Sequence, residues 1–445
     1  MSKSSTSSWG NLYRGEQRLA ALHWRNDPLP IASPTLLAIG SRRSYGDVCV
    51  NEGGLAVDMT GLNRFISFDR EAGVLRCEAG VTLREIANLV IPSGWFLPVT
   101  PGTSFVSIGG AVANDVHGKN HHVSGSFGCF VRSFELRRSS GESLICSAEK
   151  NETLFSATIG GCGLTGTILW VEISLKRINN TTLNVESISY SNYEEFLRLS
   201  EESEQTHEYC VSWINCLAVG DALGSGVFFR ANHETSAVDG ATQGSLNADS
   251  WAHNKTRSVP AIFGKGLPLV NQLSLRLFNS LYTRTHAGKR HYVETFQKYF
   301  YPLDSLLNWN RIYGRRGFFQ FQCVVPFSNQ KAIADILGQI SSSGQGSFLS
   351  VLKTMGDVKS PGMMSFCRPG VTLALDFPNG GQKTRQLLSH LEAIVVEADG
   401  AIYPAKDAVM SAETFRHCYP AIEDFKLCVD DAHSSGFWQR VSGDV

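Results

Sequence analysis

The sequence predicts an α+β protein with a glycine-rich first part and a second part of longer strands and helices. Residues 36–180 alternate short β-branched runs with glycine-rich turns, whereas residues 180–400 carry longer alternating and helical segments. Hydrophobic residues make up 42% and charged residues 18% of the 445 residues, which is typical of a globular protein with a large core. At this length about two domains are expected.

The first part is expected to contain strands around one well-capped helix. Residues 54–59 and 73–80 are short runs bounded by glycine, which is typical of strands. Residues 81–95 predict a helix, because Thr82 and Glu85 have the spacing of a capping box. The residues that recur at helical spacing and would face the core are Leu83, Ile86, Ala87 and Val90.

The second part predicts an antiparallel sheet with helices on one face. Strand-like and helix-like segments alternate along it, and the order ends in strands. These segments cover residues 191–202, 209–220, 317–326, 330–344, 371–378 and 384–400. We expect this part to face the substrate.

Residues 258–291 differ from the rest of the second part. They are apolar, and the basic residues interspersed among them are Lys265, Arg276, Arg284, Lys289 and Arg290. Two interpretations stay open: a packed helix beneath a loop, or a peripheral surface that contacts membrane lipid.

Charge and cysteine usage limit the partners and the location. The net charge of −1 provides no overall basic field for nucleic acid. The first 17 residues lack the apolar core of a signal peptide, and no apolar run is long enough to span a membrane. The 11 cysteines are scattered singly, which indicates reduced thiols. We expect a cytoplasmic protein, with peripheral contact at the inner membrane face as the open alternative.

Two motifs, a glycine motif of dinucleotide-binding folds and a histidine pair with zinc-site spacing, are present, but the residues around them do not fit these sites. Residues 161–166 satisfy G-x-G-x-x-G, but residues 167–173 are strand-like, and a dinucleotide fingerprint must open a helix. His117 and His121 have the spacing of a helical zinc site, but Gly118 lies between them and no glutamate follows His117. We expect neither a dinucleotide site of this class nor a metal, so residues 117–128 are left as a phosphate cradle or the floor of a cofactor pocket.

Four glycine-rich turns predict a long ligand that crosses the first part. They cover residues 40–47, 101–120, 125–128 and 160–166. Glycine lets backbone N–H groups approach a pyrophosphate closely, because no Cβ intervenes. A single turn of this kind is weak, but four in one part favour a cofactor site.

The turns resemble the PCMH-type FAD-binding domain of the vanillyl-alcohol oxidase superfamily. Five stretches carry the resemblance, and they are residues 40–51, 101–128, 158–166, 301–326 and 402–415. The resemblance implies a two-part FAD-binding domain of this type and a substrate domain with an antiparallel sheet flanked by helices. The implied boundaries are 1–178 for the first part of the FAD-binding domain, 179–399 for the substrate domain and 400–445 for a segment that returns to the FAD-binding domain.

The resemblance is strongest to superfamily members that act on lipid-linked sugars. It implies oxidation of the C2 hydroxyl of a polyprenyl-phosphoryl pentose to a 2-keto sugar, in cell-wall polysaccharide biosynthesis. An NAD(P)H-dependent short-chain reductase would then complete the epimerisation. The FAD is expected to be noncovalent, although a histidine attaches it in some relatives.

The resemblance also assigns residues to roles. The residues expected beside the reacting atoms are Lys406, Tyr45 and His117, and those expected to bind the sugar phosphate are Lys119, Gln320, Gln322, Lys353 and Tyr403. The residues expected to bind FAD are Gly40, Ser41, Arg42, Arg43, Ser44, Tyr45, Gly46, Pro101, Gly102, Thr103, Ser107, Ile108, Gly109, Gly110, Ala113, Asn114, His117, Gly118 and Ile168.

Lys406 is the residue that we expect to act as the base. Oxidation of a secondary alcohol requires a base within hydrogen-bond reach of the hydroxyl. A lysine can serve only when burial or neighbouring cations lower its pKa. Lys406 follows the apolar residues 401–405, which predicts delivery into a closed pocket, and a surface pair with Asp407 is the other interpretation. Lys119 and Lys353 suit a phosphate as point charges.

Other functions stay open. One alternative is a soluble aldonolactone or sugar-alcohol oxidase that uses O2. Another is a noncatalytic partner of a membrane prenyltransferase. The sequence also departs from the superfamily pattern for lipid-linked sugars at Phe300, Thr372 and Ala374, which leaves the identity of the sugar open.

Overall fold

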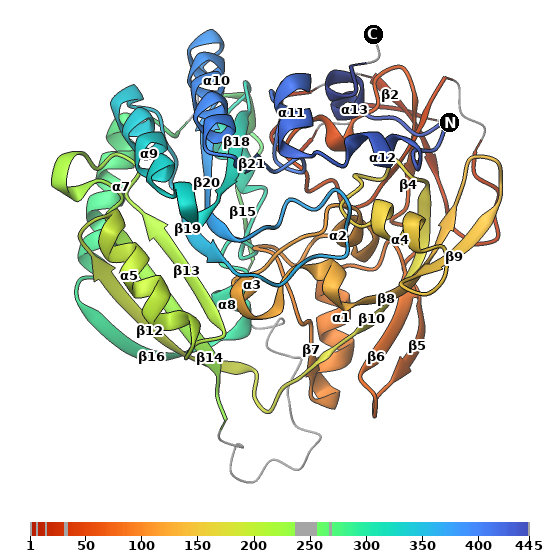
Figure 1. Cartoon of the computed structure of the whole chain (residues 1–445), viewed down its shortest axis with the longest axis horizontal. Helices are drawn as coiled ribbons and strands as arrows, with labels where there is room; N and C mark the ends of the chain where they lie inside the picture. The colour runs from red at the N-terminus through yellow and green to blue at the C-terminus, as the bar shows by residue number, and fades with distance from the viewer. Residues whose placement is uncertain are drawn as a thin grey trace.

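The computed structural model describes residues 2–5, 8–13, 16–30, 34–235, 256–266 and 269–443. Figure 1 shows a first half with two main sheets beside a second half with one large sheet. Helices and antiparallel sheets occur in both halves, so the predicted α+β class is confirmed.

The first half is built on two sheets. The smaller consists of β1 (Ser2–Ser5), β2 (Glu16–Ala21), β3 (Leu36–Ile39) and β4 (Leu55–Asp58), in the order β1-β2-β4-β3. The larger is antiparallel and consists of β5 (Phe65–Asp69), β6 (Val74–Glu78), β8 (Val131–Arg137), β9 (Ser143–Ser147) and β10 (Thr167–Ser174), in the order β5-β6-β10-β8-β9. β10 begins directly after Gly166, so the G-x-G-x-x-G run opens a strand, as expected.

Short helices connect these strands. They are α1 (Leu83–Val90), α2 (Ile108–Ala113), α3 (His121–Ser124) and α4 (Glu152–Thr158). The capping box of α1 is confirmed, since Thr82 N donates to Glu85 Oε2 at 2.8 Å and Glu85 N donates to Thr82 Oγ1 at 3.3 Å. Two short strands, β7 (Trp95–Phe96) and β11 (Lys176–Arg177), pair where the chain leaves the first half.

The second half is organised around an antiparallel sheet. Its strands are β12 (Thr182–Tyr190), β13 (Tyr209–Ile214), β14 (Gly226–His233), β16 (Lys289–Thr295), β18 (Phe318–Val325), β19 (Ser350–Met355), β20 (Gly370–Pro378) and β21 (Ala401–Ile402). They lie in the order β16-β12-β14-β13-β19-β20-β18-β21. A separate parallel pair joins β15 (Arg257–Ser258) to β17 (Leu306–Leu307).

Helices cover both faces of the large sheet. One face packs against α5 (Tyr193–Glu204), α9 (Lys331–Ser343) and α10 (Gln382–Glu397). On the other face, Tyr282 of α7 (Gln272–Thr285) lies 4.4 Å from Trp213 between ring centroids. Phe228 contacts Phe196 of α5, and the next residue, Phe229, contacts His286 directly after α7, because successive strand residues point to opposite faces. The expectation that all helices lie on one face is therefore wrong for α7.

The C-terminal segment returns to the first half. After α8 (Phe296–Phe300) and the strands that follow it, the last helices are α11 (Ala412–Cys418), α12 (Ile422–Lys426) and α13 (Gly436–Val441). Leu36 N donates to Ala432 O at 2.7 Å, and Arg440 Nη2 lies 2.8 Å from Asp47 Oδ1. We propose boundaries at residues 178 and 399 for this division. None of the helices in the described ranges has the length and apolar content needed to cross a bilayer.

Candidate active site

The loop after β3 closes against the segment after β21. Tyr45 N donates to Ala405 O at 3.1 Å, and a Cβ atom on Gly46 would lie 1.6 Å from Asp407 O, so this approach requires glycine. The backbone N–H groups of residues 41–44 donate to no acceptor within the described part of the chain. Neighbouring N–H groups without internal acceptors can bind an anion such as a pyrophosphate.

The residues around α2 form a second wall. A Cβ atom on Gly109 would lie 2.9 Å from Ala79 Cβ, so glycine lets α2 pack closely on the turn after β6. Asn114 Nδ2 donates to Gly110 O at 2.8 Å, whereas its buried Oδ1 has no hydrogen-bond partner among the described residues. A buried acceptor without a partner fits a donor on a bound ligand.

These observations fit the expected FAD. The loop of residues 40–46 offers donors for phosphates, and Asn114 offers an acceptor. Residues 101–103 and 107–114 lead into and form α2, and Gly118 follows in the next loop. Ile168 lies at the start of β10 in the same apolar cluster as the buried side chains of α2.

His117 links the two halves of the molecule. Its Nε2 lies 2.8 Å from Gln322 Nε2 of β18, and its Nδ1 lies 2.9 Å from Lys353 Nζ of β19. Lys353 also donates to Gly118 O. The loop that contains His117 in the first half is therefore joined to the large sheet by side chains that lie more than 200 residues later in the sequence.

Lys406 lies against Tyr45 rather than at the surface with Asp407. Its Nζ is 4.0 Å from the centroid of the Tyr45 ring. The Asp407 carboxylate instead binds Arg440 Nη2 at 2.9 Å. The structure therefore contradicts the interpretation of Lys406 and Asp407 as a surface ion pair.

The buried carboxyl group of Asp376 acts electrostatically on both Tyr45 and Lys406. Asp376 on β20 lies directly opposite Gln320 on β18, and Gln320 Nε2 donates to Asp376 Oδ1 at 2.6 Å. Tyr313 OH donates to Asp376 Oδ2 at 3.3 Å. Asp376 is 0% exposed, and its negative charge favours the charged form of Lys406.

Burial brings the pKa values of several groups toward neutrality. It lowers the pKa of Lys406 and of Lys353 to about 8, although Asp376 opposes the shift at Lys406. Burial and the charge of Lys353 lower the pKa of Lys119 to about 7, and burial and the neighbouring lysines hold the pKa of His117 well below its usual range. Burial raises the pKa of Asp376 to about 7. The region can therefore exchange protons near neutral pH or bind an anion.

Two expected substrate ligands have partners within the protein. Tyr403 OH donates to Asn114 O at 2.8 Å, so its ring, stacked 4.7 Å from Phe366, is the part that can line a pocket. Lys119 donates to Tyr299 O and lies 4.1 Å from the centroid of the Tyr299 ring. No hydrogen bond joins Lys119 to another expected site residue in the described ranges.

The large sheet gathers these groups on one face. Gln322 lies opposite Ala374, and Lys353 lies opposite Thr372, so these four side chains share the face that carries Asp376. The departures Thr372 and Ala374 thus lie beside the expected substrate ligands. Thr372 Oγ1 is buried and has no hydrogen-bond partner among the described residues.

Asp376 and Tyr313 are the members of this site that the sequence analysis missed. A carboxyl group within the apolar run of residues 371–378 is a signal, because a buried aspartate requires partners. The partners themselves could not be identified, since they depend on the pairing of β18 with β20. Tyr313 carried no comparable local signal.

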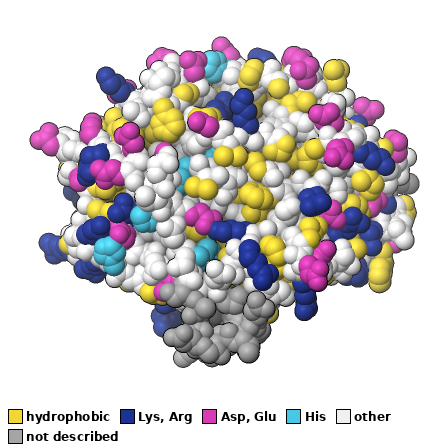
Figure 2. All heavy atoms as spheres, turned by 60° about the horizontal axis from the view of Figure 1, so that its bottom comes forward, with side chains coloured by type: hydrophobic (Ala, Val, Ile, Leu, Met, Phe, Trp, Pro, Cys, Tyr) yellow, Lys and Arg dark blue, Asp and Glu magenta, His cyan; other side chains and the backbone are white. Residues whose placement is uncertain are grey.

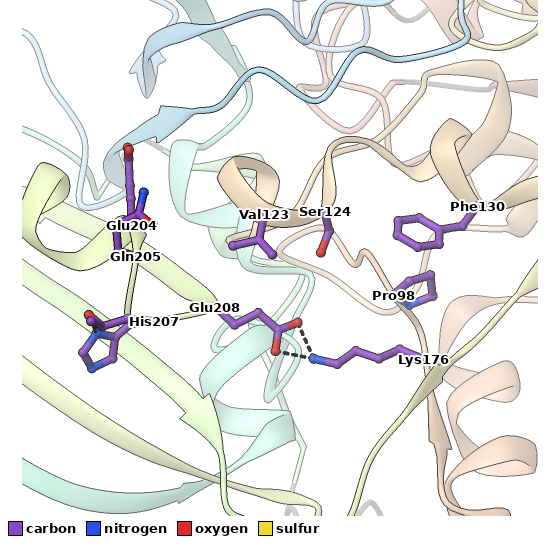
Figure 3. Close-up of a pocket in the computed structure, with 10 residues that line it drawn as sticks. Pro98, Val123, Ser124, Phe130, Lys176, Glu204, Gln205, His207 and Glu208 are labelled. Carbon is purple, nitrogen blue, oxygen red and sulfur yellow. Dashed lines mark hydrogen bonds and ion pairs between the residues drawn. The ribbon is translucent and has the colours of Figure 1, made fainter.

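A separate pocket of about 560 Å³ lies at the boundary of the halves and contains none of the expected site residues. Figure 3 shows Lys176 and Glu208, which form an ion pair across it, with Val123 and Phe130 on the side of the first half. The pocket is therefore distinct from the groups around Lys406.

Comparison with known proteins identifies relatives along most of the chain. Residues 32–147 match the family described as FAD binding domain. The chain is 34% identical to decaprenylphosphoryl-β-D-ribose oxidase of Mycolicibacterium smegmatis over 394 residues, which are 88% of this chain and 84% of that protein. It is 27% identical to a putative D-arabinono-1,4-lactone oxidase of Neurospora crassa over 139 residues, which are 31% of this chain and 24% of that protein.

Proposed function

This chain belongs to the decaprenylphosphoryl-β-D-ribose oxidase family of FAD-dependent oxidoreductases, and on this premise we propose that it oxidises the C2 hydroxyl of a polyprenyl-phosphoryl pentose to the 2-keto sugar. This step is the first half of an epimerisation. The alternative, an aldonolactone or sugar-alcohol oxidase, is supported by a match that covers only 31% of this chain.

One observation carries the proposal. A lysine with a lowered pKa, Lys406, lies beside Tyr45 of the loop of residues 40–46 and interacts electrostatically with the buried carboxyl of Asp376. A base of this kind suits removal of a hydroxyl proton near neutral pH. The nearby cation Lys353 suits a substrate phosphate.

Each site residue has a proposed role in the reaction. Neutral Lys406 accepts the proton of the C2 hydroxyl, and Asp376 stabilises the ammonium that forms. Gln320 and Gln322 bind sugar hydroxyls, while Lys353 and Lys119 bind the phosphate. Bound FAD would supply the acceptor for the hydride that leaves C2. Thr372 and Ala374 influence which sugar is accepted, because they lie opposite Lys353 and Gln322.

The FAD is proposed to be noncovalent. Both ring nitrogens of His117 lie within hydrogen-bond distance of a side chain, Gln322 at 2.8 Å and Lys353 at 2.9 Å. Neither nitrogen is free to bond to a flavin without breaking one of these contacts. Acid precipitation tests this point, since noncovalent flavin leaves with the supernatant.

The remaining parts of the proposal concern partners and location. We propose a short-chain reductase that uses NAD(P)H as the partner, because a 2-keto product must be reduced to complete the epimerisation. We also propose a role in cell-wall polysaccharide biosynthesis at the cytoplasmic side of the inner membrane, with peripheral contact through residues 258–291.

Product analysis tests the proposed reaction. The protein is incubated with farnesylphosphoryl ribose that carries deuterium at C2, once with a quinone analogue and once with O2 as the only acceptor. We expect a 2-keto product without the deuterium, a slower rate than with the unlabelled substrate, and faster turnover with the quinone. Turnover of an aldonolactone with stoichiometric peroxide, and none of the lipid-linked sugar, would contradict the proposal.

A further inference from the structure

The exposed side of α7 carries two parallel rows of side chains. One row is apolar, and its members are 79%, 62% and 53% exposed, in the order Leu273, Leu277 and Leu281. The second row has the same four-residue spacing and consists of Arg276, Ser280 and Arg284. Residues four apart lie on one side of a helix, so both rows run along its length. A helix that serves only to cover the sheet would not need an apolar outer face.

The surroundings of α7 are positively charged. Residues 257–293 contain six lysines or arginines and no aspartate or glutamate. A groove of about 390 Å³ runs beside the arginine row, and its lining residues are Asn215, Leu217, Arg276, Asn279, Ser280, Thr283 and Arg284. Two guanidinium groups beside hydroxyl groups suit a phosphate.

We propose that α7 binds the surface of an anionic phospholipid membrane, with the leucine row in the acyl-chain region and the arginine row at the lipid phosphates. An apolar row beside a basic row is the pattern of helices that lie in the membrane interface. The basic charge around α7 selects this occupant, because an ordinary protein partner with an apolar patch would leave the arginines without counter-charges.

The membrane face lies on the side of the large sheet that carries the active-site residues. The inward side chain Leu275 belongs to the same apolar cluster as Tyr45, Trp309 and Tyr313. Leu269 N also donates to Ile312 O at 2.8 Å, in the turn that ends with Tyr313. On the proposed function, a lipid-linked substrate would therefore reach the site from the same membrane that α7 contacts.

Basic residues continue beyond α7 along the edge strand. β16 begins with Lys289 and Arg290, which are exposed, although Lys289 is ion-paired with Glu186 at 3.1 Å. Among the strands in the described part of the chain, β16 pairs with β12 and lies at the edge of the sheet. Figure 1 places this strand at the edge of the second half, and Figure 2 shows basic side chains and histidines along the left of the face turned toward the reader, with some acidic side chains among them. This edge extends the positive surface toward the lipid headgroups.

Vesicle sedimentation of the FAD-loaded protein, without substrate, tests the proposal. We expect binding to vesicles of phosphatidylcholine mixed with phosphatidylglycerol, weak binding to phosphatidylcholine alone, and loss of binding at high salt. Equal binding to both vesicles, or none to either, would overturn the proposal. Because no turnover is measured, this result is independent of the proposed reaction.

Matched variants locate the contact. The triple variant Leu273→Ser, Leu277→Ser and Leu281→Ser should weaken binding on the order of 100-fold, and the double variant Arg276→Gln and Arg284→Gln about tenfold. The control Leu427→Ser changes a leucine that is 85% exposed after α12 and should bind as the wild type does. Unchanged binding of the triple variant would overturn the assignment to α7.

Two further readouts separate the membrane from other occupants of this face. If a second copy of the chain covers α7, analytical ultracentrifugation will find a dimer that the triple variant dissociates, and the proposal fails. If the membrane covers it, the wild type and the triple variant share one oligomeric state. The triple variant should then also lose turnover of a long-chain substrate in vesicles while it keeps turnover of a short-chain soluble substrate.

Discussion

The proposed cofactor side and the proposed substrate side of the candidate active site differ in the groups that form them. The cofactor side consists largely of backbone, in loops between residues 40 and 118 where glycines permit close approach. The substrate side consists of side chains on β18, β19 and β20 and on the segment after β21, joined by hydrogen bonds across the sheet. The cofactor side should therefore be sensitive to an added Cβ atom, and the substrate side to the loss of a charge or donor.

The largest effect is expected on the substrate side, from Lys406→Ala. Without its base the protein should keep bound FAD but reduce it about 10²–10⁴-fold more slowly with substrate. Stopped-flow absorbance under anaerobic conditions measures this rate.

The control is Lys331→Ala, which removes an exposed lysine at the start of α9 and should leave the rate unchanged. If the Lys406→Ala protein reduces its flavin as fast as the wild type, Lys406 is not the base. The substrate side would then not depend on this charge as we expect.

The next effect is expected on the cofactor side, from Gly46→Ala. The new Cβ atom would lie 1.6 Å from Asp407 O, so the loop must move away from the segment after β21. An overpacking cost of about 1–3 kcal/mol should weaken FAD binding by roughly 10–100-fold. Flavin titration of the apoprotein measures this. Gly338→Ala in α9 is the control, since its Cβ atom meets open space. Equal FAD affinity in both variants would contradict the backbone account.

A smaller effect is expected from Asp376→Asn, and its sign follows from the charge. The carboxylate raises the pKa of Lys406, which burial lowers to about 8. Without that charge, the pKa of Lys406 should fall further, so the acid limb of the rate profile should move to lower pH. The plateau should fall about tenfold, because asparagine keeps only one acceptor oxygen, whereas the carboxylate accepts from both Gln320 and Tyr313. Asp376→Glu keeps the negative charge, so it should return the acid limb of the pH–rate profile part of the way to its wild-type position. An acid limb that stays at the same pH, or moves to higher pH, would show that the charge of Asp376 does not raise the pKa of Lys406.

The smallest effect is expected from Thr82→Ala, in the scaffold of the first half. Loss of the capping box of α1 should lower the free energy of unfolding by about 1 kcal/mol. Urea unfolding measures this change. FAD affinity and the rate of reduction should stay the same, because α1 contributes no expected ligand. A changed rate of flavin reduction would mean that α1, and not only the glycine-rich loops of the first half, influences the reaction.

The same contrast explains what the sequence could predict. The capping box of α1, the strand after Gly166 and the glycine loops depend on neighbouring residues, so local patterns sufficed. The contact of Gln320 with Asp376 depends on the register of two strands 56 residues apart, which no local pattern encodes. The face on which α7 packs could not be predicted either, because β14 has apolar side chains on both faces of the sheet and tertiary packing decides which helix covers each.

Local patterns could also not reveal which polar groups the protein uses internally. Tyr403 has the chemistry of a substrate ligand, yet its hydroxyl is bonded to Asn114 O. Lys119 likewise donates to Tyr299 O. Asp407 was a possible partner for Lys406 by adjacency, but Arg440, from the other end of the C-terminal segment, binds it instead.

The most direct test of the central claim is an anaerobic absorbance titration of the FAD-loaded protein with a polyprenyl-phosphoryl ribose. We expect the flavin bands to bleach in proportion to the substrate added, and acid precipitation to release the flavin into the supernatant. Flavin bands that persist at saturating substrate, while an aldonolactone bleaches them, would contradict this claim.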